Sequence, residues 1–451
     1  MVRFPIRLTA FEEYFLKTDV PDYPSTFATR IEFSKQFDRG IADKAFAAIV
    51  RRNLLARCKV DDANGNRPSW VRTNEMPAII WLDMPPSKGS FPPSFMNIAD
   101  EMPVKMFGYD GSDSTDPPVL IFLVHHVAFD GLGFLQLLAD WIECYRCFEA
   151  DISLENSRLR KIDDETIVKR CKPALTVAQR FKLLRGQWKS VRATLRVLKQ
   201  KAIPLAPIPS RNESKVREPR FEEVTFSKEQ TAKLKKFAGG LQSTANSLVA
   251  RELFVTIRDW QMENGINVDG SHFRLMVPVN ERKREHRKMP ACNHCTLINL
   301  DRMPEETEDE AALLASINQE MGVIQKWRLS LNFWRAISVF RLLPGGLAKL
   351  LDGDNVSATT LFTNVGRILT KYEMRGDFTQ ASDGPLSVTD LSAIAPIKKG
   401  MVASITMFYF RDQLKLSVHY DENAFTLEQI QSFLDGLVSK INSNISASAK
   451  S

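Results

Sequence analysis

The chain has 451 residues, 44% of them hydrophobic and 25% charged, an ordinary balance for a globular protein. This length suits two domains or one large two-lobed body and needs no disulfide or metal to fold, which excludes disulfide-framework, collagen-like and disordered proteins. The longest apolar runs, such as residues 119–124, are too short to cross a bilayer. The N-terminus has no apolar stretch typical of an export signal, so we expect a cytoplasmic protein whose six cysteines are reduced thiols.

The positive charge is concentrated in one segment. Residues 156–220 hold 18 Lys and Arg against 5 Asp and Glu, a net charge of +13, whereas the whole chain carries +7. The remainder of the chain is therefore acidic, with a net charge of −6. This distribution predicts a local anionic partner and argues against a protein that coats nucleic acid.

The first part of the chain reads as alternating helices and strands. A helix is predicted over residues 43–52, where Phe46, Ile49 and Val50 share one face, followed by strands over 78–82 and 119–124. A second helix is predicted after Gly133, because apolar residues recur there at helical spacing. We assign residues 1–160 to an N-terminal lobe.

Residues 161–220 are predicted to connect two lobes, first as a basic helical crossover and then as an extended proline-rich connector, IPLAPIPS. Strands and helices alternate again in residues 221–451, which we assign to a C-terminal lobe. The predicted strands are 221–226, 273–279, 295–301, 360–363, 386–394, 402–410 and 414–419; the predicted helices include 245–262, 309–327, 331–350 and Leu427–Ile441. This alternation predicts an α/β or α+β body with two lobes.

The sequence VLIFLVHHVAFDGLG, residues 119–133, carries the strongest chemical signal. A buried strand runs directly into His125 and His126, whose side chains should point to opposite faces. An imidazole that titrates near neutral pH is a natural general base for a hydroxyl or an amine. From the residues alone, a pair of hydrogen-bonded core histidines explains the pattern equally well.

HHVAFDG resembles the HHxxxDG signature of the CoA-dependent acyltransferase superfamily, which includes chloramphenicol acetyltransferase and the condensation domains of nonribosomal peptide synthesis. The N-terminal segment resembles a further part of that family. So do VPVNER (277–282), which is followed by the pair Cys292–Asn293, and LFTNVGRI (361–368). The resemblance is to the alcohol acetyltransferase, polyketide-associated acyltransferase and wax ester synthase branches. It implies a two-lobed, chloramphenicol-acetyltransferase-like pseudo-dimer, each lobe a mixed sheet with flanking helices, with an active-site tunnel between the lobes.

The resemblance also implies an activity. An acyl group would pass from a CoA or carrier-protein thioester to a hydroxyl or amine acceptor, with His126 as the general base. The partners would be acyl-CoA or an acyl carrier protein, and the thioester of CoA or phosphopantetheine would be a co-substrate rather than a permanently bound cofactor. Two alternatives remain: a freestanding condensation domain, and a catalytically silent member that only binds acyl carriers.

The resemblance assigns the other motif residues to the framework of the site. His125 and Asp130 would be structural, Asp130 would pair with Arg282, and Gly131 would allow the tight turn after Asp130. Two further residues, Asn364 and Gly366, are expected to line the substrate tunnel.

Two remaining patterns admit more than one interpretation. Cys292, His294 and Cys295 suggest zinc ligands, but we interpret them as part of a buried strand and expect no metal site. The predicted helix 175–200 has an apolar stripe from Phe181 to Leu198 beside a basic stripe. Such a helix contacts an anionic membrane, docks an acidic carrier protein, or packs on its own lobe. We expect a monomer that is cytoplasmic or peripheral to a membrane.

Overall fold

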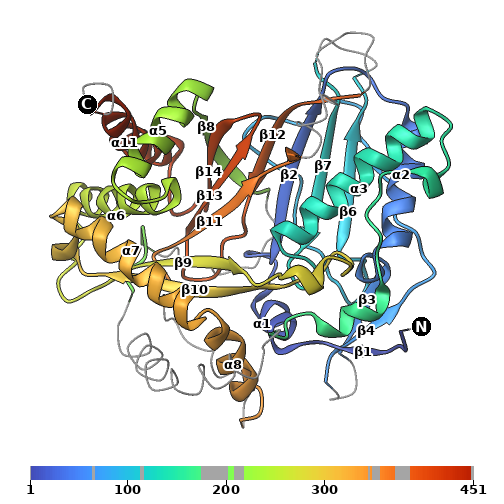
Figure 1. Cartoon of the computed structure of the whole chain (residues 1–451), viewed down its shortest axis with the longest axis horizontal. Coiled ribbons are helices and arrows are strands. Elements are labelled where there is room, and N and C mark those ends of the chain that lie inside the picture. Colours follow the sequence, from blue (N-terminus) through green and yellow to red (C-terminus); the bar gives the residue numbers. More distant parts are fainter. Residues whose placement is uncertain are drawn as a thin grey trace.

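Two lobes, each built around a β-sheet, lie side by side in the molecule (Figure 1). The computed structural model describes residues 2–62, 67–111, 116–173, 202–207, 218–343, 346–347, 356–370 and 386–447. Both main sheets mix parallel and antiparallel pairs and carry flanking helices, so the predicted fold class is confirmed.

The N-terminal lobe contains a five-stranded sheet in the order β12-β2-β7-β6-β5. Its central strand β7 is buried at every position, as its unbroken apolar sequence predicts. Helices α2 and α3 pack on each other and share one hydrophobic core with the sheet. The elements are β2 (Thr26–Phe33), β5 (Ile80–Trp81), β6 (Val104–Tyr109), β7 (Val119–His125), α2 (Arg39–Arg52) and α3 (Gly131–Glu149). A small sheet of β1 (Ile6–Arg7), β3 (Cys58–Asp61) and β4 (Ser69–Arg72) lies beside α1 (Ala10–Thr18).

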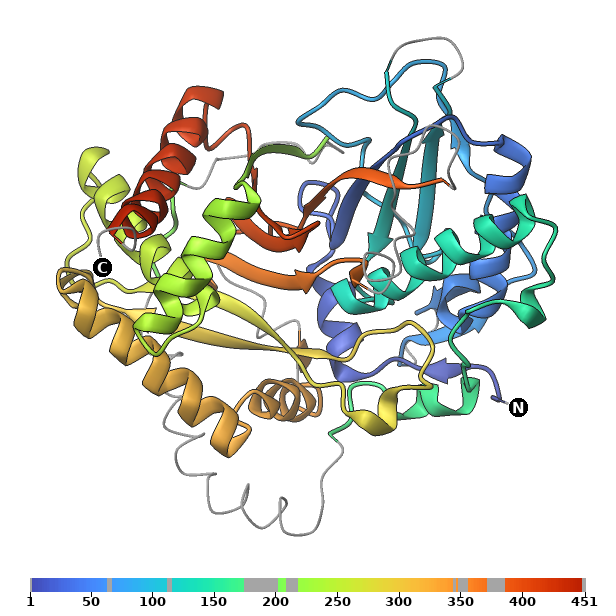
Figure 2. The ribbon, with the colours of Figure 1, turned by 45° about the horizontal axis from the view of Figure 1, so that its top comes forward.

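The C-terminal lobe contains a six-stranded sheet in the order β10-β9-β11-β13-β14-β8. Four of its helices gather on the side away from the N-terminal lobe (Figure 2), and they enclose a second hydrophobic core with the sheet. The strands are β8 (Arg220–Thr225), β9 (Phe273–Asn280), β10 (Cys295–Arg302), β11 (Thr360–Arg367), β13 (Ala403–Phe410) and β14 (Gln413–Tyr420). The helices are α5 (Lys228–Gly240), α6 (Ala245–Glu263), α7 (Glu310–Trp327) and α11 (Leu427–Ala447).

One strand crosses between the lobes. Strand β12 (Val388–Ile394) belongs by sequence to the expected C-terminal lobe, but it pairs antiparallel with β2 of the N-terminal sheet (Figure 1). The division at residue 220 therefore does not hold for this strand. On the C-terminal side, the buried Lys415 ammonium lies 2.7 Å from carboxylates of both Asp390 in β12 and Glu223 in β8. β12 thus joins the two lobes, and the site lies beside it.

Helix α8 is shorter than the sequence predicts. Helix α8 (Leu331–Phe340) ends ten residues earlier than predicted, shortly before Pro344 and the glycines that follow it. It packs on α1 through edge-to-face contacts of Phe11 with Phe333 and Trp334. The predicted basic helix 175–200, including its whole apolar stripe, lies outside the described residues. None of the described helices is long and apolar enough to span a membrane.

Candidate active site

The two motif histidines have different surroundings. His125, the last residue of β7, is fully buried, and its Nδ1 accepts a hydrogen bond of 3.2 Å from the Val127 amide. Its Nε2 lies 3.2 Å from Oδ2 of Asp19, the residue that ends α1. His125 therefore holds the end of β7 against α1, as a structural residue would.

His126 lies just beyond the strand, and its backbone is held from both lobes. Its amide donates to the Ser25 carbonyl at 2.7 Å, and its carbonyl accepts from the side-chain amide of Asn293 in the C-terminal lobe. Its ring stacks on Phe15, with the centroids 4.0 Å apart and the planes within 9°. Among the described residues, Nδ1 is buried without a hydrogen-bond partner. Because Nδ1 is enclosed, Nε2 is the nitrogen available to a substrate.

Burial determines the charge of this ring. Desolvation lowers the pKa of His126 to about 4, because the interior disfavours the imidazolium ion. The Asp130 carboxylate acts in the opposite direction, whereas the Lys398 ammonium lowers the pKa further. His126 is therefore uncharged at neutral pH and able to accept a proton.

Asp130 connects the motif to the second lobe. As the N-cap of α3 it accepts from the Gly133 amide at 2.8 Å, and it forms a two-pronged ion pair with Arg282 at 2.7 and 2.8 Å. It also accepts from the backbone amide of His294. Burial raises the pKa of Asp130, but Arg282 and these hydrogen bonds outweigh it and hold the pKa below its ordinary value. The expected pairing of Asp130 with Arg282 is therefore present.

The glycine that fits tightly is Gly133 rather than Gly131. A Cβ at position 133 would lie 2.6 Å from the Cys292 carbonyl oxygen, closer than atoms can approach. At position 131 a Cβ would meet only Val365 Cγ1, at the ordinary distance of 3.8 Å, and the backbone there is not left-handed. The expectation that Gly131 allows the tight turn is therefore wrong. Gly131 instead borders the pocket described next.

A pocket lies between the two sheets, with His126 in its wall. Among the described residues its lining is apolar or uncharged: Phe27, Thr29, His126, Gly131, Phe134, Leu135, Thr363, Val365, Ile368, Ala393, Ile394, Ala395, Pro396 and Thr406. Asn364 and Gly366 are absent from this lining, contrary to expectation. Asn364 is exposed and donates to Asn246 instead, because side chains alternate along β11. Its neighbours Thr363 and Val365 face the pocket.

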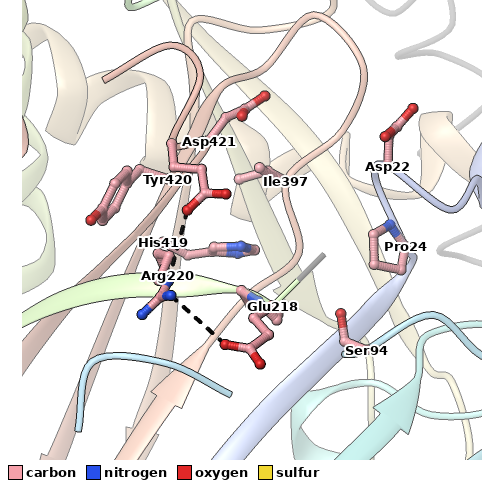
Figure 3. A pocket seen from close by; sticks show the side chains of 11 residues that line it. Asp22, Pro24, Ser94, Glu218, Arg220, Ile397, His419, Tyr420 and Asp421 are labelled. Atoms are coloured by element: carbon pink, nitrogen blue, oxygen red, sulfur yellow. Dashed lines mark ion pairs between the residues drawn. The ribbon is translucent and has the colours of Figure 1, made fainter. Parts of the chain in front are cut away.

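A second pocket is lined by Pro24, Ile397 and His419, among other residues (Figure 3). Arg220 lies 3.8 Å from carboxylates of both Glu218 and Glu422 at this pocket. His419 links the two pockets, because its Nδ1 lies 2.8 Å from the carbonyl of Ala395. Desolvation lowers the pKa of His419 to about 4.

The segment 292–295 holds the motif turn in place. Asn293 donates to the carbonyls of both His126 and Val127, and Cys292 presents its carbonyl to Arg282. The described part of the chain contains no cluster of three potential metal ligands. The importance of Asn293 is signalled in the sequence only by the family resemblance. Phe15 and Lys398 were missed, because no local pattern links them to His126.

No protein-family model matches the sequence, and no curated protein matches it either. Solved structures match over almost the whole chain. The epimerization domain from the third module of tyrocidine synthetase B is 15% identical, with a TM-score of 0.68, covering 100% of this chain and 99% of that one. The first condensation domain of the calcium-dependent antibiotic synthetase is 12% identical, with a TM-score of 0.70, covering 98% and 97%.

Trichothecene 15-O-acetyltransferase from Fusarium sporotrichioides is 12% identical, with a TM-score of 0.67, covering 97% of this chain and 94% of that one. These three structures have names that describe different activities, but they share one architecture. At such identities the likeness concerns the fold. The chain therefore has the two-lobed fold that these epimerization, condensation and acetyltransferase structures share.

Proposed function

We propose that this protein transfers an acyl group from a CoA or carrier-protein thioester to an acceptor, with His126 as the general base. The observation that carries the proposal is the His126 imidazole itself. It is uncharged at neutral pH, has one nitrogen enclosed, and forms part of the wall of a pocket between the lobes.

The chemistry follows from this placement. His126 accepts the proton of the acceptor hydroxyl or amine while the acceptor oxygen or nitrogen attacks the thioester carbonyl carbon. The tetrahedral intermediate collapses, the carbon–sulfur bond breaks, and the proton returns from His126 to the departing thiolate. A thioester is already activated, so the protein chiefly supplies proximity and a base.

The pocket chemistry narrows the substrate class. None of the described lining residues carries a charge at neutral pH, and the polar side chains are those of three threonines and His126. A buried ammonium or carboxylate would have no described counter-ion there, and an unpaired buried charge is strongly unfavourable. We infer that the group in this pocket is uncharged and largely apolar, which favours a lipophilic alcohol or an apolar acyl chain.

The positive charge of residues 156–220 supports an anionic carrier of the acyl thioester as the donor. Coenzyme A and phosphopantetheine carry phosphates, and residues 156–220 carry a net charge of +13. In the described part of this segment some cations are already engaged: Arg170 pairs with Glu12 at 2.6 Å, and Arg160 donates to backbone carbonyls. The net positive charge of the segment as a whole favours an anionic thioester carrier or anionic headgroups as its partner.

The proposal is tested by following thiol release from a panel of acyl-CoAs and acyl carrier proteins. Each donor is offered neutral alcohols, neutral amines and matched acceptors that bear a carboxylate or a quaternary ammonium. We expect release that requires an acceptor and is faster with the neutral apolar ones. A protein that binds acyl carriers without releasing thiol from any of them would contradict the proposal and support the silent alternative.

A further inference from the structure

Lys398 is a buried cation close to His126. It follows the pocket residues 395 and 396 in the chain, and it is only 9% exposed. Its ammonium donates to the Tyr14 hydroxyl at 3.0 Å and lies over the rings of Tyr14 and Phe15, at 4.2 and 4.6 Å from their centroids. Among the described residues no carboxylate forms an ion pair with it.

Phe15 is in contact with both Lys398 and the imidazole. Phe15 contacts the Lys398 ammonium and stacks flat on His126, with 4.0 Å between the two centroids. An aromatic ring attracts a cation to its face and excludes water, so the positive charge is poorly screened on this side. The two contacts place the charge within roughly 9 Å of the imidazole, close enough for substantial repulsion of an imidazolium ion.

Three other groups pack near His126, from α3, β7 and β2. Asp130, at the start of α3, favours the protonated ring, but its own charge is paired with Arg282. His125 precedes it on β7 and contacts Asp19 at the end of α1. Phe27, on β2, presents only an aromatic edge. Lys398 is thus the cation without a described counter-ion in these surroundings.

We propose that Lys398 is a positioning residue whose charge, added to the effect of burial, lowers the proton affinity of the His126 imidazole and extends to lower pH the range in which that ring is uncharged. A merely structural lysine would be expected to pair with a carboxylate, because an unpaired buried charge destabilises the fold. Retaining it beside Phe15 is explained if its repulsion of an imidazolium ion sets the proton affinity of His126. The catalytic meaning of this inference rests on the proposed function, but the electrostatic effect itself is measurable without turnover.

The test compares four variants of the full-length protein. Lys398→Met removes the charge at similar length, Lys398→Gln removes it but still offers a donor to Tyr14, and Lys398→Arg retains it. Lys399→Met is the matched control, because Lys399 is the adjacent cation but is exposed. The readout is NMR titration of histidine labelled in its imidazole ring, with the His126 signal assigned from its loss in His126→Gln.

In Lys398→Met and Lys398→Gln we expect the pKa of His126 to rise by about 1, as for one charge at this distance and an effective dielectric constant near 20. Lys398→Arg and Lys399→Met should titrate like the wild type. The acid limb of kcat/KM should move to higher pH by the same amount, with kcat at high pH retained. If Lys398→Met fails to fold, Lys398→Gln carries the test.

An unchanged His126 titration in the folded charge-removing variants would overturn the inference, as would a wild-type His126 that titrates near its ordinary value. A panel in which no thioester reacts would count against the proposed function alone. In that case the NMR titration still decides whether Lys398 lowers the proton affinity of His126.

Discussion

Two glycines at the start of α3 should respond differently to an added Cβ: one substitution should affect stability and the other substrate preference. Gly133 packs against the Cys292 backbone, whereas Gly131 faces Val365 across the pocket. Gly133→Ala should destabilise the protein by about 1–3 kcal/mol, because the Cys292 backbone must shift. Gly131→Ala should leave the melting temperature nearly unchanged and alter only the preference for bulky substrates.

Thermal unfolding of the two variants, followed by circular dichroism, checks this pair. Gly131→Ala is the matched control for Gly133→Ala, since both remove a glycine from the same helical turn. Equal losses of stability would show that the close approach of Cys292 to Gly133 is not what constrains the sequence.

The Asp130–Arg282 pair should make stability depend on pH. The pKa of folded Asp130 lies below its unfolded value of about 3.9, so the pair stabilises the fold above that pH. This contribution is lost as the pH falls through the folded pKa. Asp130→Asn should cost about 3–5 kcal/mol at pH 7, because Arg282 then lacks its carboxylate. Urea unfolding at pH 7 and pH 3 measures both values, and a variant that loses as much at pH 3 as at pH 7 would contradict this account.

At the scale of elements, hydrophobic patterning predicted individual helices and strands but not which strands pair. β7 and α3 were predictable because each has the unbroken or helical apolar spacing of a buried element. β2 was missed because Arg30 and Glu32 interrupt its apolar pattern, and only the fold shows that they pair with each other at 3.1 Å. β12 was predicted as a strand, but its pairing with β2 depends on contacts more than 350 residues apart in the chain. The family motif identified His126 and Asp130 as site residues. Phe15 and Lys398 were not identified, because their proximity to His126 also depends on contacts between residues far apart in the chain.

The crossing strand β12 should depend on Lys415. Its ammonium contacts both Asp390 and Glu223, and burial raises the pKa of Glu223 despite that contact. Lys415→Met should therefore cost about 3–5 kcal/mol, because it leaves Glu223 without its cation. The double variant Lys415→Met with Glu223→Gln should lose less than Lys415→Met alone. Urea denaturation measures both, and a double variant no more stable than the single one would refute the role of the charge pair.

At the scale of the whole molecule, the basic segment and the acidic remainder predict a salt-dependent attachment. Each cation near an anionic membrane contributes about 1 kcal/mol, and salt screens that attraction. If residues 156–220 contact headgroups, the protein should sediment with anionic liposomes at low salt and be released at high salt. Reversal of four charges, at Lys182, Arg185, Lys189 and Arg192, should abolish sedimentation. Failure of the wild type to sediment at low salt would exclude membrane contact and leave docking of an acidic carrier, or packing on the body.

At the scale of the whole molecule, residues of both lobes hold one residue, His126. Ser25 and Phe15 come from the N-terminal lobe, while Asn293 reaches the His126 carbonyl from the C-terminal lobe. The central claim is that this imidazole is the base of an acyl transfer. Its consequence is a loss of activity that leaves the fold intact.

The most direct measurement is the rate of acceptor-dependent thiol release by His126→Ala, beside the wild type and His125→Ala. Loss of a general base costs a factor of roughly 10² to 10⁴, so we expect a loss of that size in a His126→Ala variant that remains folded. His125→Ala should instead lower the melting temperature, because it removes the contact with Asp19. A folded His126→Ala variant that releases thiol at the wild-type rate would contradict the account.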